Sequence, residues 1–382
     1  MILNFIILSI KIKLIRPNIY TYFFGTLNKE LRHIEFTIVF FYKCVKIKEK
    51  MESVMIMANI KDVAKKAGCG IATVSRVINK SGYVKKETRE KVESIIKELG
   101  YQPNEIARSM TKQKNNIVGF ILPNSKHIFF GELLYHVEEE LFDLGYKLML
   151  CNSSEKIEKE ILYLDMLKNN RVDALILLTN NDVEKYLNKK LPIVSFDRYF
   201  DNVPYVASDN YMGGVLAAKR LLKHGCKKIM FVGDDAQGEY TEVKTDVSRR
   251  RMAFFETLKA NNIDNIINIE YPLKNYFVTV EQFSQLLKPY PDVDGIFCIS
   301  DFVAYTVIKV LEARGKRVPE DVKVIGYDGG RTFYNFGKKI TSINQDSKSI
   351  AKGIIKLLLE FDPNNPEKKI IIPVEISEGE TA

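Results

Sequence analysis

The sequence predicts a small all-α domain with a helix-turn-helix plan, followed by an α/β body made of two doubly wound parallel-sheet subdomains. Two short helical patterns joined by a glycine turn lie between residues 59 and 79. From residue 117 onwards, short apolar runs alternate with longer amphipathic stretches, as in parallel sheets covered by helices. The length of 382 residues is enough for two or three domains.

Residues 1–56 are predicted to be an extension outside the fold. The apolar run Met1–Ile10 precedes the basic residues, whereas a signal peptide has its basic residues first. This run is also much shorter than the about 20 residues that cross a bilayer as a helix. We therefore expect translation to start at Met51 or Met57, with a membrane tether as the alternative.

Charge is unevenly distributed along the chain. Residues 58–114 carry 13 Lys and Arg against 6 Asp and Glu, whereas residues 115–382 carry 35 against 38. A basic segment on a near-neutral body is typical of a small domain that approaches phosphates, although a solvated basic face has the same composition. The 5 cysteines are scattered and form no CxxC, which indicates a reducing, cytoplasmic compartment and predicts no metal site.

Local signals predict three helices in the basic segment. Asn59 is a good N-cap for a helix over Ile60–Ala67, which Gly68-Cys69-Gly70 ends before a second helix over Ile71–Ile78. Two helices joined by a short glycine turn form the helix-turn-helix plan. A third helix over Lys86–Leu99 carries an apolar stripe that closes a small core.

The second of these helices presents a face that suits a DNA major groove. At about 100° per residue, Val74, Val77 and Ile78 share one side. The opposite side and its flanks carry Ile71, Ala72, Thr73, Arg76 and Asn79. An arginine can bond a guanine edge twice, and small apolar side chains can touch a thymine methyl. An ordinary surface helix with one solvated arginine is the alternative.

Alternating apolar and amphipathic patterns predict the strands and helices of the body. The expected strands are Ile117–Leu122, Lys147–Cys151, Ala174–Leu178, Ile193–Phe196, Lys228–Val232, Ile266–Glu270, Gly295–Ile299 and Val322–Gly326. The expected helices are Glu132–Leu144, Glu155–Asn169, Tyr211–His224, Arg249–Asn261, Asp301–Arg314 and Ser347–Glu360. So many strands favour two doubly wound subdomains over one sheet, with a barrel as the alternative.

Ligands of open α/β sheets bind beyond the carboxyl ends of the strands, so residues that follow the strands are candidates. Asp197-Arg198, Asp301 and Asp328 follow expected strands, Phe129 and Phe130 lie near the end of the first strand, Arg250 lies near the start of a helix, and Gln345 lies in a late connection. Carboxylates, arginines and an amide beside aromatic rings suit a polyhydroxylated ligand. Taken singly, each residue is equally well a helix cap or a surface charge.

Four motifs in the basic segment occur in the order of a known family. They are Asn59 to Gly68, Ile71 to Asn79, Gly100 to Asn104 and Ala107 to Met110. In the body, Asp197-Arg198, Ser208-Asp209-Asn210, Gly326-Tyr327-Asp328 and Thr341 to Gln345 continue the order. Over about 325 residues the chain thus resembles the lactose-repressor/galactose-repressor family of bacterial transcriptional regulators, whose body is similar to periplasmic sugar-binding proteins.

The resemblance assigns roles to individual residues. It implies that Ile71, Ala72 and Arg76 read bases, and that residues 104–115 form a hinge helix and linker in which Ala107 and Met110 meet the minor groove. It also implies that Phe129, Asp197, Arg198, Arg250, Asp301, Asp328 and Gln345 line an effector pocket. The chain departs from the family at Gly70, Met110, His127-Ile128, Ser300 and Gly329, where Ser, Leu, Asn-Pro, Asn and Asp are usual.

The expected function is therefore a cytoplasmic, homodimeric, allosteric repressor. Its domains are expected at residues 58–103 for DNA binding, 104–115 for the hinge, and 116–382 for effector binding and dimerisation. Its partners are expected to be a near-palindromic DNA operator and a small sugar or sugar phosphate, without a cofactor or membrane. A secreted or cytoplasmic sugar-binding protein without regulatory DNA binding is the alternative. No GxGxxG, GxxxxGK[ST], HExxH or GxSxG motif supports an enzyme.

Overall fold

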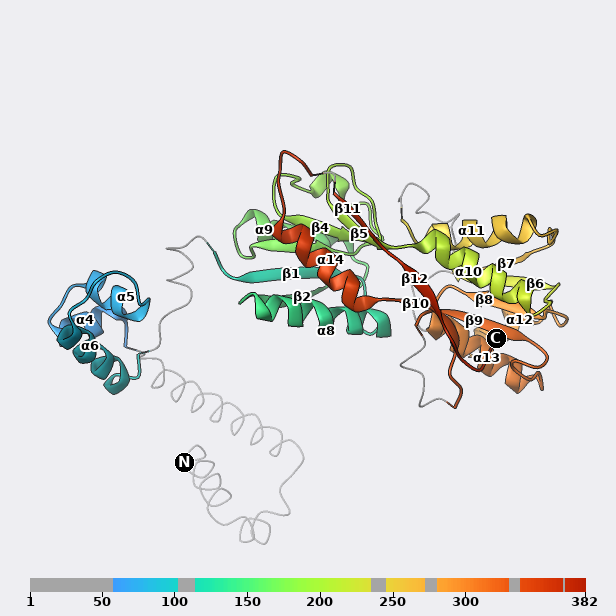
Figure 1. Ribbon diagram of the computed structural model, residues 1–382, viewed down its shortest axis with the longest axis horizontal. Coiled ribbons are helices and arrows are strands. Elements are labelled where there is room, and N and C mark those ends of the chain that lie inside the picture. Colours follow the sequence, from blue (N-terminus) through green and yellow to red (C-terminus); the bar gives the residue numbers. More distant parts are fainter. Residues whose placement is uncertain (1–57, 102–113, 235–244, 272–279, 330–336, 367) are drawn as a thin grey trace, which may run out of the picture. The chain divides into compact units, whose positions relative to one another are not determined.

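The structure, a computed structural model, describes residues 58–101, 114–234, 245–271, 280–329, 337–366 and 368–382. The chain divides into two compact units, one ending at Arg108 and one beginning at Ser109 (Figure 1). The predicted extension over residues 1–56 lies outside the described residues, as do Ala107, Met110 and most of the predicted hinge.

The first unit is the expected bundle of three helices. They are α4 (Ile60–Ala67), α5 (Ile71–Ile78) and α6 (Lys86–Glu98). Val63, Val74 and Val92, one from each helix, have no exposed surface and meet in a common core. An ion pair of 2.6 Å between Lys66 and Glu98 joins α4 to α6 at the surface. The helices therefore hold α5 against a small core, as the apolar spacing predicted.

Local signals set both ends of α4. The Asn59 side chain accepts hydrogen bonds from the backbone N–H groups of Lys61 and Asp62, while the Asp62 carboxylate accepts one from the Asn59 N–H at 2.8 Å. This reciprocal arrangement is a capping box. Gly68 ends the helix with a φ of 64°, a left-handed conformation that glycine adopts without steric cost. The chain can then turn immediately into α5.

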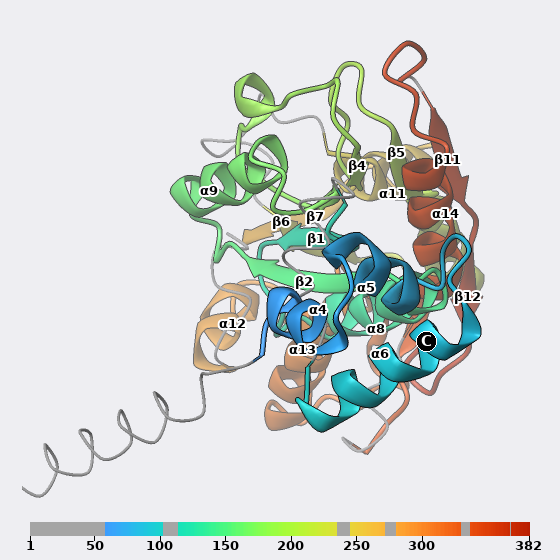
Figure 2. The same ribbon diagram turned by 90° about the vertical axis from the view of Figure 1, so that its left-hand side faces the viewer.

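The first sheet of the second unit has six parallel strands. They are β1 (Ile117–Leu122), β2 (Lys147–Asn152), β3 (Ala174–Leu177), β4 (Ile193–Phe196), β5 (Tyr205–Ser208) and β11 (Lys369–Ile372), in the order β11-β5-β4-β3-β1-β2. Helices α8 (Ile128–Asp143) and α14 (Ser347–Leu359) pack on one face and α9 (Ile157–Lys168) on the other (Figures 1 and 2). Along β1, Phe120 and Leu122 point toward α8 and α14, whereas Ile121 points toward α9, as the alternation of a strand requires.

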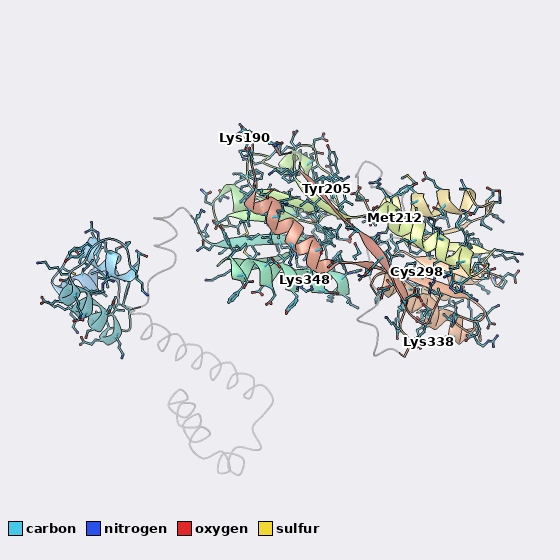
Figure 3. The ribbon with its side chains drawn as sticks, in the orientation of Figure 1. Lys190, Tyr205, Met212, Cys298, Lys338 and Lys348 are labelled. Atoms are coloured by element: carbon cyan, nitrogen blue, oxygen red, sulfur yellow. The ribbon has the colours of Figure 1, made fainter. Side chains whose placement is uncertain are left out.

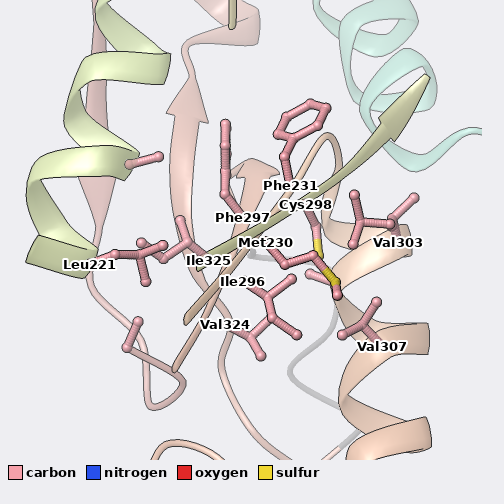
Figure 4. Close-up of a cluster of buried hydrophobic side chains, with 14 of the residues drawn as sticks. Leu221, Met230, Phe231, Ile296, Phe297, Cys298, Val303, Val307, Val324 and Ile325 are labelled. Carbon is pink, nitrogen blue, oxygen red and sulfur yellow. The ribbon is translucent and has the colours of Figure 1, made fainter. Parts of the chain in front are cut away.

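The second sheet repeats this plan with one difference. Its strands are β6 (Ile229–Asp234), β7 (Ile267–Tyr271), β8 (Gly295–Cys298), β9 (Lys323–Asp328), β10 (Thr341–Gln345) and β12 (Val374–Ser377), in the order β12-β10-β9-β8-β6-β7. The edge strand β12 is antiparallel to β10, and the other pairs are parallel. The covering helices are α10 (Asn210–Lys223), α11 (Ser248–Lys259), α12 (Val280–Leu287) and α13 (Asp301–Ala313). Figure 4 shows Phe297 and Ile325 of this sheet packed among side chains of α10 and α13.

The chain passes between the two sheets at three places. They follow β5, β10 and β11, which lead to α10, α14 and β12 respectively. The crossings are tied together, because the Ser208 hydroxyl donates a hydrogen bond of 2.7 Å to Gln345 Oε1. The Asp209 N–H likewise donates to the Ile372 carbonyl at 2.8 Å. Hydrogen bonds therefore link the first crossing to each of the other two.

The structure confirms the predicted fold class and excludes the barrel, since both sheets are open. The eight expected strands are present with shifts of one or two residues at their ends. Sequence analysis missed β5, β10, β11, β12 and the helix α12. The polar run Thr-Ser-Ile-Asn-Gln of β10 does not resemble a buried strand, although four of its five side chains are buried. Within the described ranges, no helix is long and apolar enough to span a membrane.

Candidate functional site

The outer face of α5 is open to solvent. Ile71 is 46% exposed, and Ala72, Arg76 and Asn79 are also exposed. Thr73 is half-buried at the edge of this face. The Arg76 side chain runs beside Gly82, where an added carbon would lie 3.5 Å from Arg76 Cδ. The helix thus presents a small, polar surface that ends in one arginine.

In the second unit, a buried polar cluster surrounds Arg250 of α11, which is only 5% exposed. Its Nε donates a hydrogen bond to Asn210 Oδ1 at 2.5 Å, and its Nη1 donates to the Ile299 carbonyl at 3.2 Å. Its Nη2 donates to Gln345 Oε1 at 3.4 Å, and the guanidinium carbon lies 3.5 Å from the centroid of the Tyr327 ring. Arg250 therefore contacts residues at two of the three crossings.

Two carboxylates are each linked to Arg250 through one intermediate side chain. Asp328 Oδ1 accepts from Gln345 Nε2 at 2.7 Å, and Asp197 Oδ1 accepts from Asn210 Nδ2 at 3.3 Å. Both aspartates have positive φ angles, 53° for Asp197 and 109° for Asp328, which are strained for residues other than glycine. Such strain is concentrated at functional sites. The structure thus brings together four predicted effector residues, Asp197, Arg250, Asp328 and Gln345.

Three other predicted residues have surroundings of their own. Asp301 is 3% exposed in the first turn of α13, and its Oδ1 lies against Gly326 of β9. Phe129 belongs to the hydrophobic core of the first sheet, where its ring centroid lies 6.2 Å from that of Phe196. Phe130 is half-buried beside it. Phe129 therefore has a structural role in this conformation.

The structure does not bring the Arg198 guanidinium to the Arg250 cluster. Its Nη1 donates to the backbone carbonyls of Thr179, at 3.2 Å, and Asn181, and its guanidinium carbon lies 4.5 Å from the centroid of the Phe200 ring. Burial lowers the pKa of Arg198 to about 10, against the opposing charges of nearby acidic residues. In this structure Arg198 is thus held at the ends of β3 and β4 by bonds within its own subdomain.

Comparison with known proteins decides the family. A model described as bacterial regulatory proteins, lacI family, matches residues 59–104, and one for a periplasmic binding protein-like domain matches residues 218–382. The sucrose operon repressor of Streptococcus mutans is 37% identical over 330 residues, which cover 85% of this chain and all of that protein. The chain belongs to the lacI family of bacterial regulatory proteins.

Further relatives agree with this membership. The ribose operon repressor of Halalkalibacterium halodurans is 36% identical over 313 residues, which cover 81% of this chain and 92% of that protein. A crystal structure of the lac repressor dimer bound to operator and an anti-inducer shares the fold, with a TM-score of 0.73, 21% identity, and coverage of 85% and 98%. As a lacI-family member, the chain is a DNA-binding transcriptional regulator and not an enzyme, as the sequence analysis predicted.

Three residues of this lacI-family site, Asn210, Tyr327 and His127, were not among the candidates from the sequence. His127 immediately precedes α8 of the first sheet, yet its Nε2 lies 3.9 Å from Asp328 Oδ2 in the second. Burial and the charge of Arg250 lower the pKa of His127 to about 4, so the imidazole is neutral at neutral pH. A distance of 3.9 Å is too long for a hydrogen bond, so this is a polar contact between the subdomains. The available signal was the departure from the family's usual Asn-Pro.

The two strained aspartates of this lacI-family site resist ionisation. Burial raises the pKa of Asp197 to about 6 and that of Asp328 to about 7, although the charge of Arg250 opposes both changes. In the unfolded chain both groups titrate near pH 4. Between about pH 4 and pH 7 the folded protein therefore holds protons that the unfolded chain releases. It follows that the free energy of unfolding decreases as the pH rises through this range.

We expect Asp328→Asn to increase the stability of this lacI-family protein at pH 8, because the amide has no buried charge and its oxygen can still accept from Gln345. The expected gain in free energy of unfolding is on the order of 2 kcal/mol. Urea denaturation at pH 5 and pH 8 measures this gain. The free energy of unfolding should differ less between these two pH values in the variant than in the parent protein. Asp292→Asn, at a side chain that is 72% exposed, is the control. Equal pH dependence in Asp328→Asn and the parent protein would contradict the assignment.

Proposed function

We propose that this lacI-family regulator represses a carbohydrate-utilisation operon and that a small sugar changes its affinity for the operator. The observation that carries this proposal is the buried cluster around Arg250, where two carboxylates, two amides and a guanidinium meet at the carboxyl ends of β4 and β9. These groups offer donors and acceptors of the kind that pair with sugar hydroxyls. The sucrose and ribose operon repressors among the relatives support the class of target operon.

The exposed face of α5 is proposed to read the operator in the major groove. Ile71, Ala72, Thr73, Arg76 and Asn79 form this surface, whereas Val74 and Val77 are committed to the core. By family resemblance, Ala107 and Met110 would enter the minor groove from the hinge. One such helix reads only a half-site, so a homodimer on a near-palindromic operator is proposed. The dimer of the lac repressor structure supports this assembly.

The coupling between sugar and operator is proposed to run through the crossings. A sugar that takes over bonds of Arg250 would change its contacts with Asn210 after β5 and with Gln345 at the end of β10. Because Ser208 and Gln345 are bonded to each other, the two subdomains would then shift together. Only a ligand that binds the two arrangements with different affinity shifts their equilibrium.

The domain boundaries and compartment are part of the proposal. We assign residues 58–103 to DNA binding, 104–115 to the hinge and 116–382 to effector binding and dimerisation, with residues 1–56 outside the fold. The division of the chain between Arg108 and Ser109 supports a boundary within the proposed hinge. A cytoplasmic location is proposed because the partner is operator DNA.

An electrophoretic mobility shift with the DNA upstream of the protein's own gene tests the proposal. The expected result is a specific shift at nanomolar protein that a competing unrelated DNA does not remove. Adding candidate sugars one at a time should then change the shift for at least one of them. A protein that binds a sugar but shifts no DNA would instead be a sugar-binding protein without a regulatory role.

We expect Arg76→Ala to weaken specific operator binding by about 1–3 kcal/mol, because the variant loses the bidentate pairing with a guanine edge. The same assay measures the change, with a scrambled operator to report nonspecific binding. Lys97→Ala, which removes an exposed charge from α6, is the control and should leave the ratio of specific to nonspecific affinity unchanged. Unchanged operator affinity in Arg76→Ala would show that α5 is not the recognition helix.

A further inference from the structure

The described part of the buried cluster contains more acidic than basic side chains, which limits the charge that a bound sugar can carry. We infer that the effector site accepts an uncharged sugar and rejects the phosphate ester of the same sugar by electrostatic repulsion. This inference rests on the proposed function, which leaves both ligand classes open. It is drawn from the buried charges at the strand ends and from the hydrogen bonds that already occupy Arg250.

Among the residues that the structure describes at this edge of the two sheets, acidic side chains outnumber basic ones. Asp197 and Asp301 are 6% and 3% exposed, and the Asp328 side chain is 13% exposed. They lie directly after β4, in the first turn of α13, and at the end of β9. Arg198 and Arg250 are the described basic residues buried here, and Arg250 acts on both Asp197 and Asp328. A phosphate dianion placed among these described side chains would therefore meet more negative than positive charge.

Three of the five N–H donors of Arg250 already form hydrogen bonds within the protein. Its Nε, Nη1 and Nη2 donate to Asn210, to the Ile299 carbonyl and to Gln345, and its face covers the Tyr327 ring. Phosphate recognition by arginine uses paired N–H donors that point at the anion. A phosphate that uses such paired donors competes with these buried bonds, whereas a hydroxyl needs only a single donor or acceptor.

Arg198 and His127 do not offset the negative charge of these aspartates. The Arg198 guanidinium is bonded to the carbonyls of Thr179 and Asn181, and the acidic groups Asp182, Glu160 and Glu184 act on it. His127, which faces Asp328, is neutral at neutral pH because burial and Arg250 disfavour its protonated form. The first turn of α13, which would otherwise attract an anion, already contains the Asp301 carboxylate.

An uncharged sugar can form hydrogen bonds with the same set of side chains. At pH 8 the carboxylates of Asp197 and Asp328 are mostly ionised and accept hydrogen bonds from hydroxyl groups. The side-chain amides of Asn210 and Gln345 can both donate and accept. Each hydroxyl can thus exchange one existing bond of the cluster for an equivalent bond without adding charge. The cost of a like charge beside a buried carboxylate is several kcal/mol, which corresponds to at least about 100-fold in affinity.

The test compares sugars with their own phosphate esters on the full chain. Isothermal titration calorimetry at pH 8 in Tris buffer would use ribose with ribose 5-phosphate, fructose with fructose 6-phosphate, and sucrose with sucrose 6-phosphate. In any pair that binds, the uncharged member should bind at least about 100-fold more tightly. Equal or tighter binding of the phosphate ester would overturn the inference while leaving sugar-controlled repression intact. If no member of any pair binds or changes operator binding, the proposed function fails and the inference fails with it.

A variant that changes charge but not side-chain volume distinguishes electrostatic repulsion of the phosphate ester from its exclusion by size. Asp328→Asn keeps the volume of the side chain and removes its charge, so the preference for the uncharged sugar should decrease by at least about 10-fold. Asp292→Asn, at an exposed position paired with Lys228 at 3.0 Å, should leave the preference unchanged. If Asp328→Asn does not fold, as judged by its thermal unfolding, Asp197→Asn is used in its place. A preference that does not change in the folded variant would mean that the ester is excluded by its size, and would overturn the inference.

Discussion

Replacing Arg250 with methionine is expected to decrease the free energy of unfolding of the effector domain by about 3–5 kcal/mol and to abolish its response to sugar. Methionine keeps much of the apolar contact with Tyr327 but leaves Asp197 and Asp328 without their cation. Removing one partner from a buried charged network costs this much because the remaining charge is desolvated and unpaired. The variant also loses the bonds that join α11 to Asn210 and Gln345.

Thermal or urea unfolding of the full chain measures the effect, and the neighbouring residue provides the control. Arg249 is 45% exposed and lies 3.7 Å from Asp246, so Arg249→Met should change the stability by less than about 1 kcal/mol. The loss in Arg250→Met should be smaller at pH 5 than at pH 8, because Asp197 and Asp328 are largely protonated at pH 5. Equal losses in the two variants, or a loss that does not depend on pH, would show that Arg250 is not the counterion of these aspartates.

Local signals explain why the helix-turn-helix could be predicted almost to the residue. The capping box of Asn59 and Asp62 and the left-handed Gly68 act within a few residues of the chain. Nothing distant has to be known to place the ends of α4 or the start of α5. The face of α5 that packs inward was also predictable, because Val74 and Val77 follow the helical period.

Strands that depend on distant partners were predicted less completely. The apolar runs of β1, β3 and β8 were recognised because both faces of each strand are covered by helices. By contrast, β10 places polar side chains beside its neighbours β9 and β12, and its residue Gln345 serves the buried cluster. A buried polar strand is stable only with the partners that bond to it, and those partners lie elsewhere in the sequence.

In the site, too, the sequence indicates where a residue lies but not which way its side chain points. That Asp197 and Asp328 lie at strand ends follows from the apolar runs before them, and the fold then brings them together. The direction of Arg198 is set by the Thr179 and Asn181 carbonyls, for which the sequence holds no signal. His127 belongs to the site because its neighbour Asp328 comes from the other sheet, a contact that only the folded chain creates.

Because α10 and α11 are in tight contact at Gly214, we expect Gly214→Ala to be strongly destabilising. A carbon added at Gly214 would lie 2.1 Å from the Arg250 carbonyl oxygen and 3.0 Å from Ala253 Cβ, so α10 and α11 would have to separate. Overpacking against a backbone atom cannot be relieved by rotating a side chain. We expect a loss of about 3 kcal/mol or more in the free energy of unfolding, or roughly 6–12 °C in melting temperature.

The matched control is Gly131→Ala on the exposed face of α8, where an added carbon has no neighbour within 4 Å. This change should stabilise the protein by up to about 1 kcal/mol, because alanine loses less conformational freedom than glycine in a helix. The two variants add the same methyl group with opposite expected signs. Because α10 begins at Asn210 and α11 carries Arg250, separating the helices should also break the 2.5 Å bond between these side chains. Gly214→Ala should thus lose sugar binding even below its melting temperature, and a variant with normal sugar affinity would show that the helix contact does not position Arg250.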